Sequence, residues 1–287
     1  MILYDWLILP FESFSFMRIA LIACLALSLA NGPLGTMLLL RRMSLDGDVL
    51  SHAVMPGAAL GFLYAGHTMF ALSFGGLASG FVVAALAGLL ARIRPLRSDT
   101  SLVAFYLVAL SLGVMLVAWR GSNVDVMRVL FGTVLAIDVR SLVAIASVSS
   151  VTMLLLAVFY RPLAVDSFDP LFLRVAGGSS IFRAMFVVLV LLVLVVSFQA
   201  FGTLLAVGPM LLPAAAARCW THRVAVMALL ATVFGMIACY AGLLVSYHAN
   251  LPSGPAIVLA AGLMYGLSLL AAELRLRAQA AMGGTNA

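Results

Sequence analysis

Two side chains that can bind a metal ion lie four residues apart in an apolar segment. They are Asp48 and His52, in the stretch LRRMSLDGDVLSHAVMPGAALGF from Leu40 to Phe62. A spacing of four places both side chains on one face of an α-helix, where a carboxylate and an imidazole can both ligate a divalent metal ion. Inserting a charged group into the centre of a membrane span costs about 2.5–3.5 kcal/mol on insertion scales. An ionisable residue in such a span is therefore a candidate for a functional role.

The same pair has a structural interpretation. Asp48 would cap a helix that starts after Gly47, and His52 would hydrogen-bond to a neighbouring helix. The depth of the pair is also open. The preceding Arg41-Arg42 places the segment's start near the cytoplasm, unless the helix before it is broken at Gly32-Pro33.

A third candidate ligand is His248, in the segment SYHANLPSGP at the outer end of a later apolar run. An imidazole there could help a metal ion to enter, whereas a single interfacial histidine commonly has a structural role. The chain contains no HExxH, no GxSxG and no protease-like pair of aspartates, which argues against an intramembrane enzyme. We expect no tightly bound cofactor.

The composition places these residues in a membrane protein. Of the 287 residues, 65% are hydrophobic and 9% are charged, and the mean hydropathy is +1.21. Soluble domains carry about a quarter charged residues. The apolar runs are long and continuous, which favours spanning helices over a β-barrel. The expected fold is all-α, a polytopic helical bundle in a single transmembrane domain over residues 1–287.

All sixteen basic residues are arginines, because the sequence contains no lysine. A P-loop needs its lysine to reach the phosphates of a nucleotide, so this chain has no such ATP site. If ATP drives the protein, a separate subunit hydrolyses it. The net charge of +6 comes from arginines at the ends of apolar runs, as membrane topology requires, and does not indicate nucleic-acid binding.

About eight or nine apolar segments are candidate transmembrane helices. They are Phe16–Leu40, Gly47–Gly66, Met69–Ala91, Thr100–Trp119, Ser141–Tyr160, Arg183–Phe198, Gly202–Ala217, Val224–Tyr247 and Pro255–Leu274. The two that flank residues 199–202 are short for a bilayer that needs about twenty residues, so they form one broken helix or two half-length ones. Residues 121–140 are expected to form a re-entrant or interfacial helix. Glycine and proline occur within the spans at Gly32-Pro33, Gly208-Pro209, Pro213 and Pro252 to Pro255. Transporters use such breaks to line pathways, whereas membrane helices also tolerate glycine and proline for packing alone, and packing is the favoured interpretation of any single break.

The arginines predict the orientation of the bundle. Twelve fall on one side, and the other four are Arg18, Arg120, Arg128 and Arg140. The richer side is cytoplasmic by the positive-inside rule. Nine crossings then put the N-terminus outside and the C-terminus inside, with a short cytoplasmic tail over residues 275–287.

The largest polar loop, about residues 161–182, contains a short helix with both ends encoded in the sequence. Asp169 suits the N-cap, Pro170 the first helical position, and Gly177 or Gly178 the left-handed position after the helix. A capped helix that projects into the cytoplasm indicates a docking element.

An apolar face on this short helix supports docking, since Leu171, Phe172 and Val175 share one side. The alternative is a helix that lies on the lipid headgroups. The loop alone does not separate the two interpretations.

Four motifs occur in an order that resembles a known family. They are LRRMSLDGDVLSHAVMPGAALG early in the chain, FDPLFLRVAGG from Phe168, GTLLAVGPMLLPAAAARCW from Gly202 and LPSGPAIVL from Leu251. Together they resemble the permease subunit of bacterial ABC importers for zinc, manganese or iron, over nearly the whole chain. One departure is Asn250, which stands where an acidic residue is expected before the LPSG turn.

The resemblance implies a multi-pass protein of the bacterial inner membrane. Two permease copies would pair around a central pathway, and each would dock a cytoplasmic ABC ATPase through a coupling helix, here about Asp169–Ala176 with Arg174 among its residues. A periplasmic or lipid-anchored binding protein would deliver the metal. Asp48 and His52 match the family's transport-path acid and histidine.

The leading hypothesis is therefore an ATP-driven permease in which a divalent metal passes a transient site at Asp48 and His52. The rival is a secondary transporter driven by an ion gradient, with the same two residues as a proton relay. The cytoplasmic docking helix favours the permease, because a gradient-driven carrier needs no ATPase dock. Zinc or manganese is expected, with iron as an alternative, since a carboxylate and an imidazole suit all three.

Overall fold

The computed structural model describes residues 2–65, 69–93, 107–109, 111–113, 115–116, 134–168, 179–202 and 205–283. These residues form helices and no strand, which confirms the all-α prediction. Five helices are long and apolar enough to cross a membrane. They are α3 (Ser15–Leu40), α8 (Val139–Val158), Ile181–Phe201 of α11 (Ser179–Phe201), α13 (Val224–Ala249) and Ser253–Arg275 of α14 (Ser253–Gly283). The larger number of eight or nine stays a prediction, because the expected span at 100–119 lies mostly outside the described residues.

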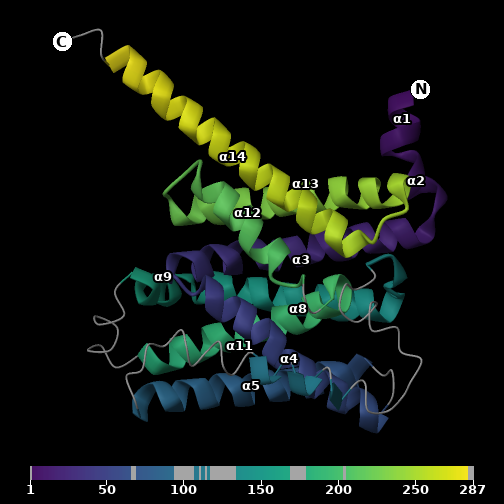
Figure 1. Cartoon of the computed structure of the whole chain (residues 1–287), viewed down its shortest axis with the longest axis vertical. Coiled ribbons are helices and arrows are strands. Elements are labelled where there is room, and N and C mark those ends of the chain that lie inside the picture. Colours follow the sequence, from purple (N-terminus) through teal and green to yellow (C-terminus); the bar gives the residue numbers. More distant parts are fainter. Residues whose placement is uncertain are drawn as a thin grey trace.

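The remaining elements complete the bundle. They are α1 (Ile2–Leu7), α2 (Leu9–Ser13), α4 (Ser44–Ala65), α5 (Met69–Ile93), the 3-10 turn η1 (Val134–Ala136), α9 (Tyr160–Phe168) and α12 (Gly208–Arg218). In Figure 1 the α3–α4 turn, α9 and the α12–α13 turn lie at the left end of the bundle. The N-terminal helices and the α13–α14 turn lie at the right end, and α14 leaves the bundle toward the C-terminus.

Helix α3 runs unbroken through the bundle, so Gly32-Pro33 does not interrupt it and the packing interpretation holds there. Its residues contribute to both large apolar cores, one shared with α4, α11 and α12 and the other with α8, α13 and α14. The glycines have a packing role instead. A Cβ atom at Gly32 would collide with Thr232, and one at Gly35 would collide with the carbonyl of Met210. Small residues therefore let α12 and α13 approach α3 closely.

Helix α11 is a full-length span, whereas the sequence predicted a short segment at Arg183–Phe198. It ends at Phe201, and Gly202 follows in the left-handed region with φ 82°. Helix α12 has only 11 residues and begins with Gly208-Pro209, which here mark the start of a separate helix. The arrangement is a complete span followed by a short helix, and it matches neither of the two expected alternatives.

The segment before α8 packs on protein. Val134 and Ile137, at the described end of the expected re-entrant segment, are buried in the core that includes α3. Asp138 then caps α8 by accepting a hydrogen bond from the Ser141 N–H at 2.9 Å. Hydrogen bonds from Ser141 hold the pKa of Asp138 below its ordinary value. Residues 121–133 lie outside the described residues.

Helix α14 continues to Gly283, so the predicted tail over residues 275–287 begins as an extension of this helix. Arg275 lies over the Trp220 ring, 4.2 Å from its centroid, and connects the extension to the residues that follow α12. Large exposed leucines lie along α14, at positions 259, 263, 267, 270 and 274. Such a surface is typical of a helix that faces lipid.

Candidate functional site

The first candidate site lies on α4, which begins at Ser44. Asp48 is therefore inside the helix, and its interpretation as a helix cap is wrong. Only three residues separate α4 from the end of α3 at Leu40. At 1.5 Å per residue, Asp48 and His52 lie about 6 Å and about 12 Å along the axis from Ser44. The pair thus lies about one to two turns along α4 from the α3–α4 turn.

The two side chains lie on one face of α4, as their spacing predicts. His52 Nε2 is 3.6 Å from Asp48 Oδ1. This separation exceeds a hydrogen bond, but it is close to the roughly 3.4 Å that separates nitrogen and oxygen ligands bound about 2.1 Å from one tetrahedral metal ion. The His52 side chain is 5% exposed and that of Asp48 is 53% exposed. The geometry can therefore chelate an ion that approaches from the side of Asp48.

A side chain of α5 replaces part of the backbone hydrogen bonding of α4 just beyond the pair. Pro56 has no N–H to donate to the carbonyl of His52. One residue further along, the Ser79 hydroxyl accepts a hydrogen bond from the Gly57 N–H at 3.2 Å and donates to the carbonyl of Ala53 at 2.8 Å. Ser79 thus links α5 to the backbone of α4 directly after His52, a contact that could not be seen in the sequence.

Glycines allow this close contact between α4 and α5. A Cβ atom at Gly57 would collide with the carbonyl of Gly75, and one at Gly61 would collide with the carbonyl of Ala71. Glycines four residues apart on a membrane helix are the sequence signal for such packing. That signal, in the Gly57 and Gly61 pair, could have predicted a closely packed partner helix for α4.

His248 lies at the other end of the bundle and contacts the N-terminal segment. Its Nε2 is 3.1 Å from the carbonyl oxygen of Trp6, and its ring stacks on the Trp6 indole with centroids 4.2 Å apart. Asn250 ends α13 in the left-handed conformation, which asparagine tolerates well. These contacts favour the structural interpretation of His248. Among the described residues, no three His, Cys, Asp or Glu side chains are close enough to hold a metal ion.

The predicted docking residues Asp169, Pro170, Leu171, Phe172, Arg174 and Gly177 lie outside the described residues. The docking helix therefore stays a prediction. The segment before it was expected to be a loop but forms α9, in which Leu163 and Asp166 are buried. Helix α9 thus leads directly into the predicted docking segment.

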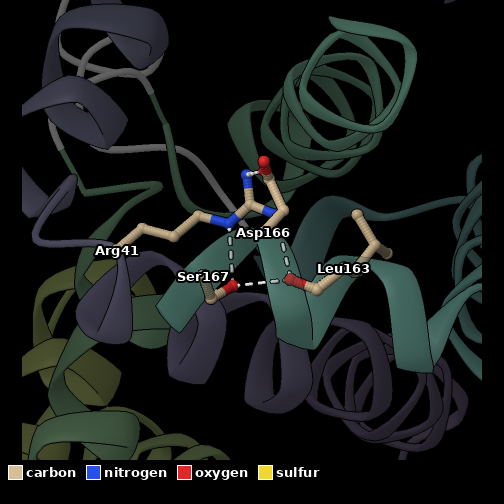
Figure 2. Close-up of polar contacts among 4 residues, drawn as sticks. All are labelled: Arg41, Leu163, Asp166 and Ser167. Carbon is tan, nitrogen blue, oxygen red and sulfur yellow. Dashed lines mark hydrogen bonds and ion pairs between the residues drawn. The ribbon is translucent and has the colours of Figure 1, made fainter. Parts of the chain in front are cut away.

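A buried ion pair connects α9 to the α3–α4 turn (Figure 2). Arg41 Nη1 is 2.9 Å from Asp166 Oδ2, and both side chains are at most 5% exposed. Arg41 Nε donates to Ser167 Oγ at 3.0 Å, and Nη2 donates to the Leu163 carbonyl at 3.2 Å. The guanidinium also lies 4.0 Å from the centroid of the Phe186 ring on α11. In the sequence, Arg41 indicated only the orientation of the bundle and the depth of the pair in the membrane.

A bundle of apolar spans that carries a potential metal-binding pair places the chain in the class of membrane transport subunits. The ABC 3 transport family matches residues 13–272, and the chain belongs to this family. It is a multi-pass protein of the bacterial inner membrane, and the ATPase that serves it is a separate chain. The predicted resemblance to permease subunits of bacterial metal-ion ABC importers is confirmed.

Known relatives match the chain over nearly its whole length. It is 33% identical to the manganese transport system membrane protein MntC of Listeria monocytogenes, over 90% of this chain and 91% of the relative. It is 32% identical to the manganese import system permease protein ScaB of Streptococcus parasanguinis, over 91% and 92%.

Solved structures share the fold. The structure of PsaBC from Streptococcus pneumoniae in complex with a Fab matches with a TM-score of 0.85 and 30% identity, covering 93% of this chain and 95% of the other. A metal-chelate type ABC transporter in an inward-facing conformation matches with a TM-score of 0.60 over 88% and 84% of the two chains. At 15% identity, the second likeness shows the fold alone.

Proposed function

We propose that the chain is the permease of an ATP-driven importer of divalent metal ions, with manganese as the main substrate. The observation that carries the proposal is the pair of ligand atoms 3.6 Å apart on α4, in a chain that belongs to the ABC 3 transport family. Manganese is favoured over zinc and iron because MntC and ScaB, which match nearly the whole chain, are named for manganese.

The proposed site at Asp48 and His52 binds the ion only in passing. A closed structural zinc site uses four protein ligands, whereas this pair offers two from one chain. A transport site must bind well enough for entry and weakly enough for release. A carboxylate oxygen suits manganese, and the imidazole adds a nitrogen ligand that zinc and iron also accept.

The proposed assembly contains two permease copies around a central pathway. The half-exposed side chain of Asp48 supports this, because a second copy could then complete the set of ligands. We propose that a periplasmic or lipid-anchored protein delivers the metal near residues 248–254. The α13–α14 turn, which contains the described part of this stretch, lies at the opposite end of the bundle from α9 in Figure 1.

ATP binding and hydrolysis in the partner would switch the permease between outward- and inward-open states through the Asp169–Ala176 segment. The rival, a gradient-driven transporter with a proton relay, loses its main support because ABC family members use a separate ATPase. No described feature of the site favours proton relay over metal binding.

Deleting this chain is expected to lower cellular manganese several-fold when external manganese is scarce. The reason is that passive entry of a hydrated divalent ion through the bilayer is negligible. Total cell manganese, zinc and iron should be measured one metal at a time, with a strain that carries the wild-type chain on a plasmid as control. A loss confined to zinc or iron would contradict the assignment of manganese. Unchanged levels of all three would contradict metal import.

A further inference from the structure

We propose that the Arg41–Asp166 ion pair is the joint that transmits movement of the ATPase-docking segment to the metal-binding helix α4. The inference rests on the proposed function and assigns two positioning residues to it. Neither residue contacts the metal pair. Their role is to make α4 follow α9 when the ATPase changes state.

The joint lies on a short route between the two functional segments. Asp166 precedes the predicted docking helix, which starts at Asp169, by three residues. Arg41 precedes the first residue of α4, Ser44, by the same number. One ion pair therefore connects segments that are more than 120 residues apart in the chain.

The contacts of Arg41 hold its guanidinium in one orientation against α9. Its guanidinium contacts Leu163, Asp166 and Ser167, which lie on one face of α9 (Figure 2). Its planar face rests on Phe186 of α11. An arginine fork held at several atoms has one orientation, unlike the single ammonium of a lysine. A displacement of α9 must therefore carry Arg41 with it or break several bonds.

The turn that follows Arg41 carries movement into α4. Arg42 adopts the left-handed conformation, with φ 56°. The Met43 N–H donates to the Leu38 carbonyl at 3.0 Å, and the Gly47 N–H donates to the Met43 carbonyl at 3.2 Å. Backbone hydrogen bonds thus continue from the last turn of α3 to the first turn of α4. Asp48 lies only one residue beyond this connection.

Stability alone does not account for a charged pair at this position. Leu163 and Phe186, which contact Arg41, are buried apolar residues. In such surroundings, well-packed apolar side chains commonly hold two segments as firmly as a buried ion pair does, because both charges lose their hydration. An ion pair adds a fixed partner and a fixed geometry, which are the properties that a transmitting joint requires.

The test compares metal moved per ATP hydrolysed in proteoliposomes that contain the permease assembled with its ATPase and supplied with its binding protein. The double variant Arg41→Met with Asp166→Leu replaces the joint by apolar side chains. We expect it to assemble, to melt within a few degrees of wild type and to hydrolyse ATP, while manganese moved per ATP falls at least tenfold. The matched control is Arg277→Gln with Glu273→Gln, which removes an exposed ion pair of 3.0 Å on α14. Its ratio should equal that of wild type.

A second variant, Arg41→Lys, keeps the charge but loses the fork, and it decides the matter if the double variant fails to assemble. We expect it to lower manganese moved per ATP with little change in melting temperature. If the assembled variants move as much manganese per ATP as wild type, the ion pair is not a transmitting joint. Equal losses of transport, ATPase activity and thermal stability would also contradict the proposal. If the wild-type complex moves no divalent metal, the proposed function itself fails, and that result precedes any comparison of variants.

Discussion

Replacing Asp48 or His52 with alanine is expected to abolish manganese uptake while the permease still assembles with its ATPase. Asp48 and His52 are the two proposed ligands on α4, with Oδ1 and Nε2 3.6 Å from each other. Losing even an outer-shell partner of a metal ligand costs about 10- to 100-fold in affinity or activity. Losing one of two direct ligands should cost more. Uptake of radioactive manganese by cells that express equal amounts of each variant measures the effect.

The control for this experiment is Leu60→Ala, which changes an exposed position on the same helix. We expect uptake close to wild type in this variant. Asp48→Asn and His52→Gln keep the shape of each side chain and separate ligand chemistry from packing. Normal uptake in the Asp48 or the His52 alanine variant would show that the pair is not the metal path.

A glutamate at Leu171 or Phe172 is expected to detach the ATPase or to uncouple it from transport. Both residues belong to the apolar face of the predicted docking helix, and burying a charge at such a contact costs several kcal/mol unless it is paired. Co-purification of the ATPase with a tagged permease tests detachment. ATP turnover in the purified complex tests uncoupling.

The matched control is His222→Glu, which places a charge at an exposed position in the α12–α13 turn, at the same end of the bundle as α9. This variant should retain the ATPase. If the Leu171 and Phe172 variants also retain it, with normal turnover and transport, the Asp169–Ala176 segment is not the dock.

The sequence was sufficient for the elements that local patterns determine. The start and end of α3, α5 and α13 follow the predicted apolar runs within a few residues, because each run is continuous and bounded by polar or arginine-containing turns. The juxtaposition of Asp48 and His52 was also predictable, since residues four apart in a helix always share a face.

The features that the sequence left open or did not reveal depend on partners that are distant in the sequence. Gly32-Pro33 could be a helix break or a packing feature from the sequence alone, and the contact with Thr232 shows that the glycine serves packing. Arg41 indicates only topology in the sequence, whereas the structure places it beside Asp166 of α9. Likewise, Ser79 has no visible role until α5 packs on α4. Periodicity carries no information about such long-range pairs.

The central claim is that ATP hydrolysis in a partner chain drives metal through this permease. It is tested most directly by manganese accumulation in proteoliposomes that contain the permease with its ATPase and binding protein, with a protonophore present. We predict manganese accumulation that requires ATP, persists with the protonophore and disappears in Asp48→Ala. Accumulation without ATP, or its loss with the protonophore while ATP is held constant, would contradict the account and indicate a gradient-driven carrier.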